Sequence, residues 1–275
     1  MKDNISICFC INDLYAQHLC VVLTSILENN PYSNFSFYVI TNDITEYNKN
    51  KIFSLKNKYN NFEIQYISVD KSIFSNFNIT IDYISIETYF RYILANLLPN
   101  LDKILYLDVD LVVNGELSSL WNTDIDNYYC AGVEDINFDT NSYKKEISLN
   151  DNDIYINAGV ILFNLKKIRE NKISDKFFEN QELYNNIKYQ DQDIINITLR
   201  NNIKKLDYIY NFTTKTSRKF PKLKEKAIII HYVGPKKPWK DLSLNKLKIL
   251  YYYYRSQGPY NNYSMLITKL LKLFK

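Results

Sequence analysis

The chain has 275 residues, of which 46% are hydrophobic, and a formal net charge of +4. This length and composition predict one large globular domain, or one domain with a small appendage. No apolar stretch is long enough to span a bilayer, and no apolar signal-peptide core follows Met1. We therefore expect a cytoplasmic protein without membrane-spanning segments.

The cysteines and the distribution of charge further limit the class of protein and its partners. Cys8, Cys10, Cys20 and Cys130 lack zinc-ligand spacing and lie in apolar surroundings, which predicts reduced thiols in the core. From residue 215 onward, 15 Lys and Arg face only two acidic residues, which leaves 19 basic and 28 acidic residues before it. Because this basic part lacks a nucleic-acid-binding motif, phosphate groups or an anionic membrane surface are favoured as partners over nucleic acid.

The first quarter of the chain alternates between strand and helix patterns. Residues 5–11, 35–40 and 62–67 read as strands, and residues 15–28 and 46–59 read as helices. This alternation predicts an α/β fold with a mostly parallel sheet that helices cover on both faces. No G-x-G-x-x-G motif follows the first strand, so the common dinucleotide-binding loop is not expected.

A pair of aspartates follows the next buried strand, at residues 104–107. Because side chains alternate along a strand, Asp108 and Asp110 emerge on one face. Two neighbouring carboxylates at the end of an apolar run favour a hard divalent cation, Mg²⁺ or Mn²⁺. The alternative is a turn aspartate followed by an aspartate paired with a lysine, and the motif alone does not separate the two.

Polar residues also gather around later elements. A predicted helix at 84–98 carries Arg91, and a strand at 128–133 ends at Glu134 and Asp135. A central strand at 155–164 is interrupted at residues 157–159, where small residues let a ligand or backbone come close.

Two further helices are predicted at 174–187 and 191–200. The second begins with Asp191 and Gln192, which places polar side chains at the positive end of a helix. A last buried strand, at 227–232, contains His231, one of only two histidines. The following loop contains Gly234 and Lys237, whose backbone amides and ammonium groups suit phosphate oxygens.

The end of the chain reads as two helices, at 244–254 and 265–275. The second is basic and amphipathic. Two interpretations stay open: this helix packs onto the domain, or it attaches reversibly to the inner face of an anionic membrane.

Four motifs in this order resemble glycosyltransferase family 8, which includes bacterial lipopolysaccharide galactosyl- and glucosyltransferases. They are D-V-D at 108–110, N-A-G at 157–159, Y-Q-D-Q-D at 189–193 and H-Y-V-G-P-K-K-P-W at 231–239. The resemblance covers nearly the whole chain. It implies a GT-A fold, with a Rossmann-like catalytic domain at 1–240 and a basic helical segment at 241–275. It also implies transfer of galactose or glucose from a UDP-sugar to a saccharide or glycolipid acceptor with retention, using Mn²⁺, or Mg²⁺ in its place.

The resemblance assigns roles to individual residues. It implies that Asp108, Asp110 and His231 hold the metal. The donor nucleotide is expected to contact a further set: Cys10, Ile11, Asn12, Asp13, Leu14, Tyr15, Arg91, Val109, Gly234 and Lys237. The hexose is expected to contact Asn157, Asp191 and Gln192, with Glu134 or Asp135, whose register stays open. Asn12 and Leu14 depart from the residues common in relatives, and Tyr83 occupies an acceptor-pocket position.

For retention, front-face substitution is favoured, in which the departing UDP oxygen takes the acceptor proton. The alternative is a covalent intermediate on Gln192, whose amide is a poor nucleophile. Three other functions are alternatives. D-V-D-L-V resembles the start of haloacid-dehalogenase-like phosphatases, although no late Asp-Asp pair completes their Mg²⁺ site. The others are a non-catalytic nucleotide-sugar-binding protein and a self-glucosylating, glycogenin-type enzyme that uses one of the 25 tyrosines.

Overall fold

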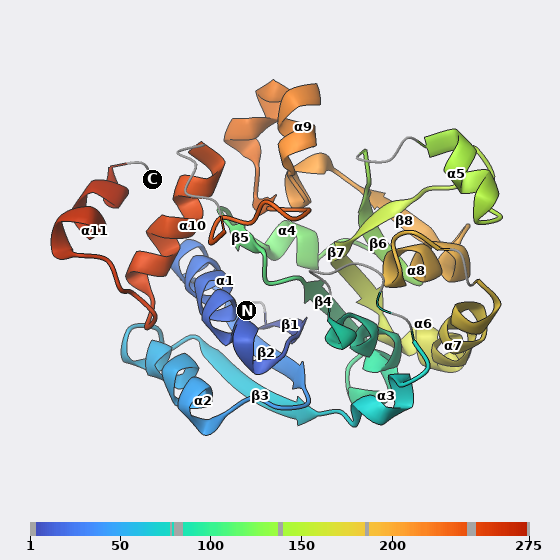
Figure 1. Ribbon diagram of the computed structural model, residues 1–275, viewed down its shortest axis with the longest axis horizontal. Helices are drawn as coiled ribbons and strands as arrows, with labels where there is room; N and C mark the ends of the chain where they lie inside the picture. The colour runs from blue at the N-terminus through green and yellow to red at the C-terminus, as the bar shows by residue number, and fades with distance from the viewer. Residues whose placement is uncertain are drawn as a thin grey trace.

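A seven-stranded sheet forms the centre of the computed structural model, which describes residues 4–77, 79, 85–136, 140–184, 187–240 and 246–273 (Figure 1). The strand order is β3-β2-β1-β4-β7-β6-β8. The bounds are β1 (Asn4–Cys10), β2 (Asn34–Thr41), β3 (Phe62–Ser68), β4 (Lys103–Leu107), β6 (Cys130–Glu134), β7 (Ile156–Asn164) and β8 (Ile203–Leu206). Only β7 runs antiparallel to its neighbours, β4 and β6, so the predicted mostly parallel sheet is confirmed.

Helices cover both faces of this sheet. Along β1, Ile5, Ile7 and Phe9 point into one core with α1, while Cys8 points into the opposite core with α3, α7 and α8. The cysteines are free thiols, as predicted. The helix bounds are α1 (Ala16–Asn29), α2 (Glu46–Phe53), α3 (Leu94–Leu97), α4 (Ser118–Trp121), α5 (Thr140–Glu146), α6 (Leu165–Glu170), α7 (Ile173–Leu183), α8 (Asp191–Leu199), α9 (Thr214–Lys219), α10 (Lys246–Gln257) and α11 (Met265–Lys272).

The helix predicted at 84–98 is wrong in type. Residues 86–93 form a 3₁₀ helix, η4 (Ile86–Ile93), and only the last turn, α3, is α-helical. Arg91 turns back onto this segment, because its Nε donates to the carbonyl oxygen of Thr88, 2.8 Å away. The predicted helix at 46–59 similarly ends at Phe53 and continues as the 3₁₀ turn η2 (Ser54–Asn57).

One strand prediction also needs correction. β7 runs through residues 157–159 without interruption. The last strand, β9 (Ile229–His231), lies outside the central sheet and pairs antiparallel with β5 (Leu111–Val113). This small sheet pairs His231 with Leu111, next to the aspartate motif. β8 was not predicted, because its sequence I-K-K-L has no strand alternation.

The carboxyl-terminal part joins the rest through a third core. Tyr251 and Tyr254 of α10 are buried there with Val21 of α1, and α10 lies alongside α1 in Figure 1. Tyr253 of α10 also donates to Glu28 Oε1, 2.5 Å away. The division of the chain at residue 240 remains a prediction. Within the described residues, no helix is both long enough and apolar enough to cross a membrane.

Candidate active site

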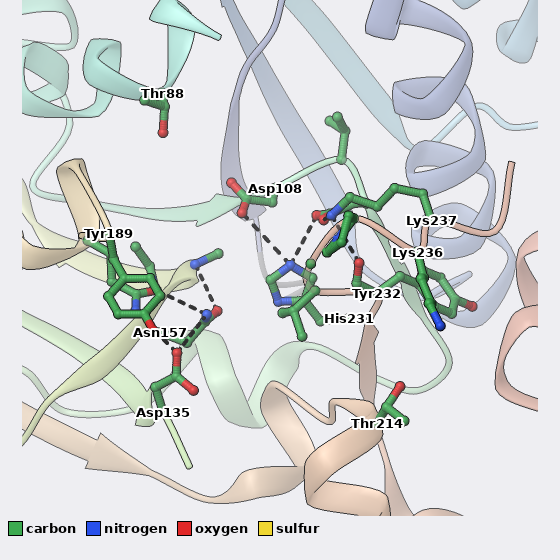
Figure 2. Close-up of a pocket in the computed structure, with 18 of the residues that line it drawn as sticks. Thr88, Asp108, Asp135, Asn157, Tyr189, Thr214, His231, Tyr232, Lys236 and Lys237 are labelled. Atoms are coloured by element: carbon green, nitrogen blue, oxygen red, sulfur yellow. Dashed lines mark hydrogen bonds and ion pairs between the residues drawn. The ribbon is translucent and has the colours of Figure 1, made fainter. Parts of the chain in front are cut away.

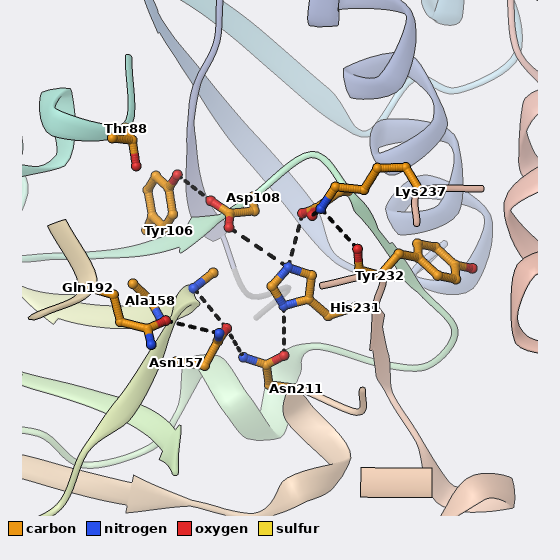
Figure 3. Close-up of polar contacts among 12 residues, drawn as sticks. Thr88, Tyr106, Asp108, Asn157, Ala158, Gln192, Asn211, His231, Tyr232 and Lys237 are labelled. Atoms are coloured by element: carbon orange, nitrogen blue, oxygen red, sulfur yellow. Dashed lines mark hydrogen bonds and ion pairs between the residues drawn. The ribbon is translucent and has the colours of Figure 1, made fainter. Parts of the chain in front are cut away.

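Asp108, Asp110 and His231, which we call the carboxylate cluster, meet at the end of β4. They arrive from the β4–β5 connection and from β9, and their ligand atoms lie within 4.8 Å of one another. His231 Nε2 is 3.0 Å from Asp110 Oδ1 and 3.8 Å from Asp108 Oδ2 (Figure 3). Two carboxylates and one imidazole at this spacing form a donor set that suits Mn²⁺, with Mg²⁺ as the alternative.

Gly159 of β7 lies directly against this cluster. A Cβ at this position would lie 2.3 Å from His231 Cε1 and 2.7 Å from Asp108 Oδ2, closer than carbon atoms approach in proteins. The sequence predicted a close approach to this stretch of strand. The approaching groups are the side chains of the carboxylate cluster itself.

Asn211 orients the ring of His231. Its Nδ2 donates to Asn157 Oδ1 at 2.8 Å, so its Oδ1 accepts from His231 Nδ1 at 2.9 Å. Nδ1 therefore carries a proton, and Nε2 faces the carboxylates, 3.0 Å from Asp110 Oδ1, as the ring atom that would bind a cation. An imidazole oriented in this way by its other nitrogen is the usual arrangement at metal sites.

Arg91 and Tyr106 hold one oxygen of Asp108. Tyr106 Oη donates to Asp108 Oδ1 at 2.6 Å, and Arg91 Nη2 lies 3.3 Å from the same oxygen. The guanidinium stacks on the Tyr106 ring at 4.2 Å. Burial alone would lower the pKa of Arg91, but Asp191, Tyr106 and Asp108 raise it above its usual value, so this cation stays charged. Oδ2 of Asp108 is left facing His231.

Lys237 balances the charge of Asp110. The two side chains form an ion pair, and Lys237 Nζ also donates to the Tyr232 carbonyl oxygen at 3.0 Å. Burial alone would raise the pKa of Asp110, but the nearby Lys237 and His231 hold it below its usual value. The β9–α10 loop thus delivers a buried ammonium group to the edge of the carboxylate cluster.

A second group, which we call the amide cluster, consists of Asn157, Gln192 and Asn211. Gln192 Oε1 accepts from Asn157 Nδ2 at 3.1 Å and from the Ala158 backbone amide at 3.0 Å. Gln192 Nε2 donates to Asp135 Oδ2 and to Tyr155 Oη, both at 3.2 Å. The amide cluster therefore runs from the start of α8 to His231 without an ionic contact between its members (Figure 3).

Asp191, the first residue of α8, is buried beside Arg91. Its Oδ1 accepts from Thr88 Oγ1 at 2.8 Å, and its Oδ2 lies 3.2 Å from Arg91 Nε. Burial raises the pKa of Asp191 to about 6, although Arg91 opposes the shift. Gln190, just before it, has a φ of +48°, a strained conformation for a residue with a Cβ.

The carboxylate cluster lines one cavity of about 740 Å³ with Arg91, Tyr106, Lys237, Asp191, Asn157 and Gln192 (Figure 2). Of the residues expected at the site, these line it: Cys10, Ile11, Tyr15, Arg91, Asp108, Val109, Asp110, Asp135, Asn157, Asp191, Gln192, His231, Gly234 and Lys237. The structure thus brings together most of the predicted set from segments far apart in the chain.

Four predicted contacts do not line the cavity. Asp13 Oδ1 instead accepts from Thr45 and Asn48, at the start of α2. Asn12 donates to Glu87, and Leu14 is 78% exposed. The register between Glu134 and Asp135 is set by an irregular pairing of β6 with β7.

Through that irregularity, Asp135 faces the cavity and Glu134 pairs with Lys205 outside it, at 2.5 Å. Tyr83 lies outside the described residues. Several residues that line the cavity were not predicted. They include Tyr106, Tyr189, Lys236 and three residues of α9, Thr214, Lys215 and Arg218. Tyr106 stands two residues before Asp108 on the same strand face, a spacing that could have identified it.

The profile of glycosyl transferase family 8 matches residues 6–243. A predicted glycosyltransferase of Haemophilus influenzae is 38% identical over 247 residues, which are 86% of this chain and 74% of the relative. A lipopolysaccharide 1,2-glucosyltransferase of Escherichia coli is 27% identical over 254 residues, 87% of this chain and 74% of the relative. The crystal structure of the galactosyltransferase LgtC with donor and acceptor sugar analogues has a TM-score of 0.84 at 28% identity, covering 97% of this chain and 100% of LgtC.

Proposed function

The chain belongs to glycosyl transferase family 8, and from this premise we propose that it transfers galactose or glucose from a UDP-sugar, with retention, to a saccharide or glycolipid acceptor of a cell-surface glycan. The observation that carries the proposal is the carboxylate cluster, which three distant segments assemble in one cavity beside Lys237. The family match leaves the phosphatase alternative without support.

Mn²⁺, or Mg²⁺ in its place, would be held by Asp108, Asp110 and His231. The fit is supported by the spacing of their ligand atoms and by the contact of Asn211 with Nδ1, which leaves Nε2 facing the carboxylates. When bound, such an ion neutralises charge on a diphosphate leaving group. Lys237 would add a second positive charge to the same group.

The β9–α10 loop suits contact with phosphate oxygens. Gly234 has a φ of +81°, a conformation that residues with a Cβ rarely adopt, and it lines the cavity. Arg91 would act mainly by positioning, because its guanidinium already contacts Thr88, Ala158, Asp108 and Asp191.

Front-face substitution remains the favoured route. The bond from the anomeric carbon to the UDP oxygen breaks, the bond to the acceptor oxygen forms on the same face, and the acceptor proton passes to the departing UDP oxygen. Gln192 is poorly suited as a nucleophile, because its carbonyl oxygen already accepts two hydrogen bonds. Asp191 and Gln192 would steady the positively charged sugar. Trapping a glycosyl-enzyme in the wild type, together with inactivity of Gln192→Ala, would instead support the covalent route.

The function is tested by measuring UDP release from UDP-galactose, UDP-glucose and UDP-N-acetylhexosamines, with Mn²⁺ and with a chelator. We expect release from at least one UDP-hexose, lost with the chelator and restored by Mn²⁺. Absence of UDP release together with absence of UDP binding in calorimetry would refute the proposal. UDP binding without turnover in the presence of acceptors would favour the non-catalytic binder. Intact-protein mass after incubation with UDP-glucose distinguishes self-glucosylation, which increases the mass of the protein, from transfer to a separate acceptor.

We further propose peripheral membrane contact through α11, on the cytoplasmic face of the membrane. This helix exposes Met265, Leu266 and Leu270, together with the cations Lys269 and Lys272, and the exposed Leu273 follows it directly. Sedimentation with vesicles of anionic and of neutral lipid tests it. Binding to the anionic vesicles should fall in a Leu266→Glu, Leu270→Glu variant, and no binding of the wild type would refute the contact.

A further inference from the structure

Each aspartate of the carboxylate cluster is paired with a cation, and the first of these cations is fixed in place. Arg91 Nη2 lies 3.3 Å from Asp108 Oδ1. The same guanidinium donates to the carbonyl oxygens of Thr88 and Ala158, at 2.8 and 2.7 Å, and lies 3.2 Å from Asp191 Oδ2. Charge-assisted contacts of this kind are strong, and several of them hold Arg91 independently of Asp108. We therefore expect Arg91 to stay beside Asp108 when a metal ion binds.

Lys237, the cation paired with Asp110, sits at the tip of a flexible side chain. Its ammonium group contacts Asp110 Oδ2 and the carbonyl oxygen of Tyr232, the latter at 3.0 Å (Figure 3). The backbone of its loop is anchored separately, because Trp239 stacks on a ring of α1. Rotation of the side chain alone would therefore move the ammonium group from Asp110 into the cavity, which Lys237 lines.

Both oxygens of Asp110 are engaged by groups of the protein. Oδ1 lies 3.0 Å from His231 Nε2, and Oδ2 pairs with Lys237. The ion pair is enclosed, since Lys237 is 7% exposed and the Asp110 side chain 13% exposed. Charges interact strongly in such surroundings, so a second cation brought to the same carboxylate is repelled by the first. Lys237 therefore competes with a metal ion for Asp110.

We propose that Lys237 is an internal counter-ion that exchanges partners: it neutralises Asp110 until a divalent cation binds, and it then turns to the diphosphate of the donor. This inference rests on the proposed function and goes beyond it, because it makes the ammonium group a competitor of the metal ion. The exchange has two consequences of opposite sign. In the protein alone, Lys237 weakens metal binding, and with the metal bound it strengthens nucleotide binding. The two binding events are thereby coupled, so that the metal is held loosely without its nucleotide.

Lys237→Met tests the exchange, because it keeps a flexible stem and removes the charge. Calorimetry measures Mn²⁺ binding to the protein alone and UDP binding at saturating Mn²⁺. A buried carboxylate that has lost its counter-ion gains more from a divalent cation, so we expect the variant alone to bind Mn²⁺ about tenfold more tightly than the wild type. At saturating Mn²⁺ it should bind UDP about tenfold more weakly. A lysine that served only the diphosphate would leave the first affinity unchanged.

Two further variants serve as controls. Lys236→Met removes the same charge from the neighbouring, exposed position of the loop, and its Mn²⁺ affinity without nucleotide should stay within about twofold of the wild type, since solvent screens that charge. Lys237→Arg keeps the charge and should keep the weak Mn²⁺ binding of the wild type. If Lys237→Met folds poorly, Lys237→Gln removes the charge while keeping a hydrogen-bond donor, and it should show the same two shifts.

The exchange is overturned if the neutral variants of Lys237, per folded molecule, bind Mn²⁺ without nucleotide no more tightly than the wild type. An equal rise in Lys236→Met would also overturn it, because the effect would then come from the overall charge of the cavity. Failure of the wild type to bind UDP at saturating Mn²⁺ is a different result, which refutes the proposed function and the donor half of the exchange with it.

Discussion

The two clusters that meet in the cavity are held together by different forces. The carboxylate cluster concentrates charge: two aspartates face an imidazole and a buried ammonium, and Asp110 depends on Lys237 for neutralisation. The amide cluster is uncharged, and hydrogen bonds between side-chain NH₂ groups and carbonyl oxygens hold it together. We infer that the first cluster responds to cations and pH, whereas the second responds to changes of shape and of hydrogen-bonding groups.

The largest effect is expected from Asp110→Asn. The change removes one metal ligand and leaves Lys237 buried without its carboxylate. We expect metal-dependent UDP release to fall at least ~1,000-fold and the metal-free protein to lose about 3 kcal/mol of unfolding free energy. Calorimetry with Mn²⁺ and UDP, and urea unfolding, measure the two effects. Glu134→Gln, which alters a carboxylate paired outside the cavity, should leave both nearly unchanged, and equal behaviour of the two variants would contradict the assignment.

Two glycines of neighbouring strands distinguish a local clash from a general loss of packing. In Gly159→Ala, the new Cβ meets the His231 ring and the Asp108 carboxylate, so we expect activity to fall roughly 100-fold as ligands are displaced. In Gly132→Ala, the nearest atom is the terminal Cδ1 of Ile156, at 2.5 Å, which belongs to a side chain in the core. That variant should lose stability and keep its Mn²⁺ affinity per folded molecule. Equal metal affinity in both variants would argue against a metal site beside Gly159.

Asn211 belongs to the amide cluster and also contacts His231 of the carboxylate cluster. Two substitutions each remove one of these two contacts. Asn211→Leu removes the acceptor for His231 Nδ1, so Mn²⁺ affinity should fall about 10- to 100-fold. Asn211→Asp keeps an acceptor for Nδ1 but loses the donor to Asn157 Oδ1. We expect it to retain Mn²⁺ affinity while its KM for the UDP-sugar rises. If both substitutions weaken Mn²⁺ binding equally, Asn211 does not act through the His231 tautomer.

Asn211 also shows where prediction from the sequence stops. The strands and Asp108, Asp110 and His231 carry local signals, because burial, alternation and strand-end carboxylates are visible within a few residues. Asn211 lies in an irregular segment after η5 (Tyr208–Tyr210), and its role depends on β9 leaving the central sheet to pair with β5. That pairing is set by tertiary packing, which no local pattern reports. The choice between Glu134 and Asp135 was undetermined for the same reason, since one irregular pair in β6 decides it.

The last prediction concerns stability, and it involves the residues that support the loop carrying Lys237. Trp239 of this loop stacks on His18 of α1, with ring centroids 3.7 Å apart, and His18 Nδ1 lies 2.6 Å from Tyr251 Oη. Burial lowers the pKa of His18 from 6.5 to about 3, with Arg255 and Lys237 adding to the shift and Asp110 opposing it. The folded protein therefore excludes a proton that the unfolded chain binds. The stability due to neutral His18 is complete above pH 6.5 and is lost as the pH falls toward 3.

At pH 5 this loss amounts to about 2 kcal/mol relative to pH 7. His18→Phe preserves a ring against Trp239 but cannot titrate, so its unfolding free energy in urea should fall about 2 kcal/mol less between these pH values than that of the wild type. Asp191, with its pKa raised to about 6, acts in the opposite direction, because protonation below that value favours its buried form. That contribution is the same in both proteins, so the difference between them isolates His18. Identical pH dependence would show that the loop beside the carboxylate cluster does not depend on a neutral histidine.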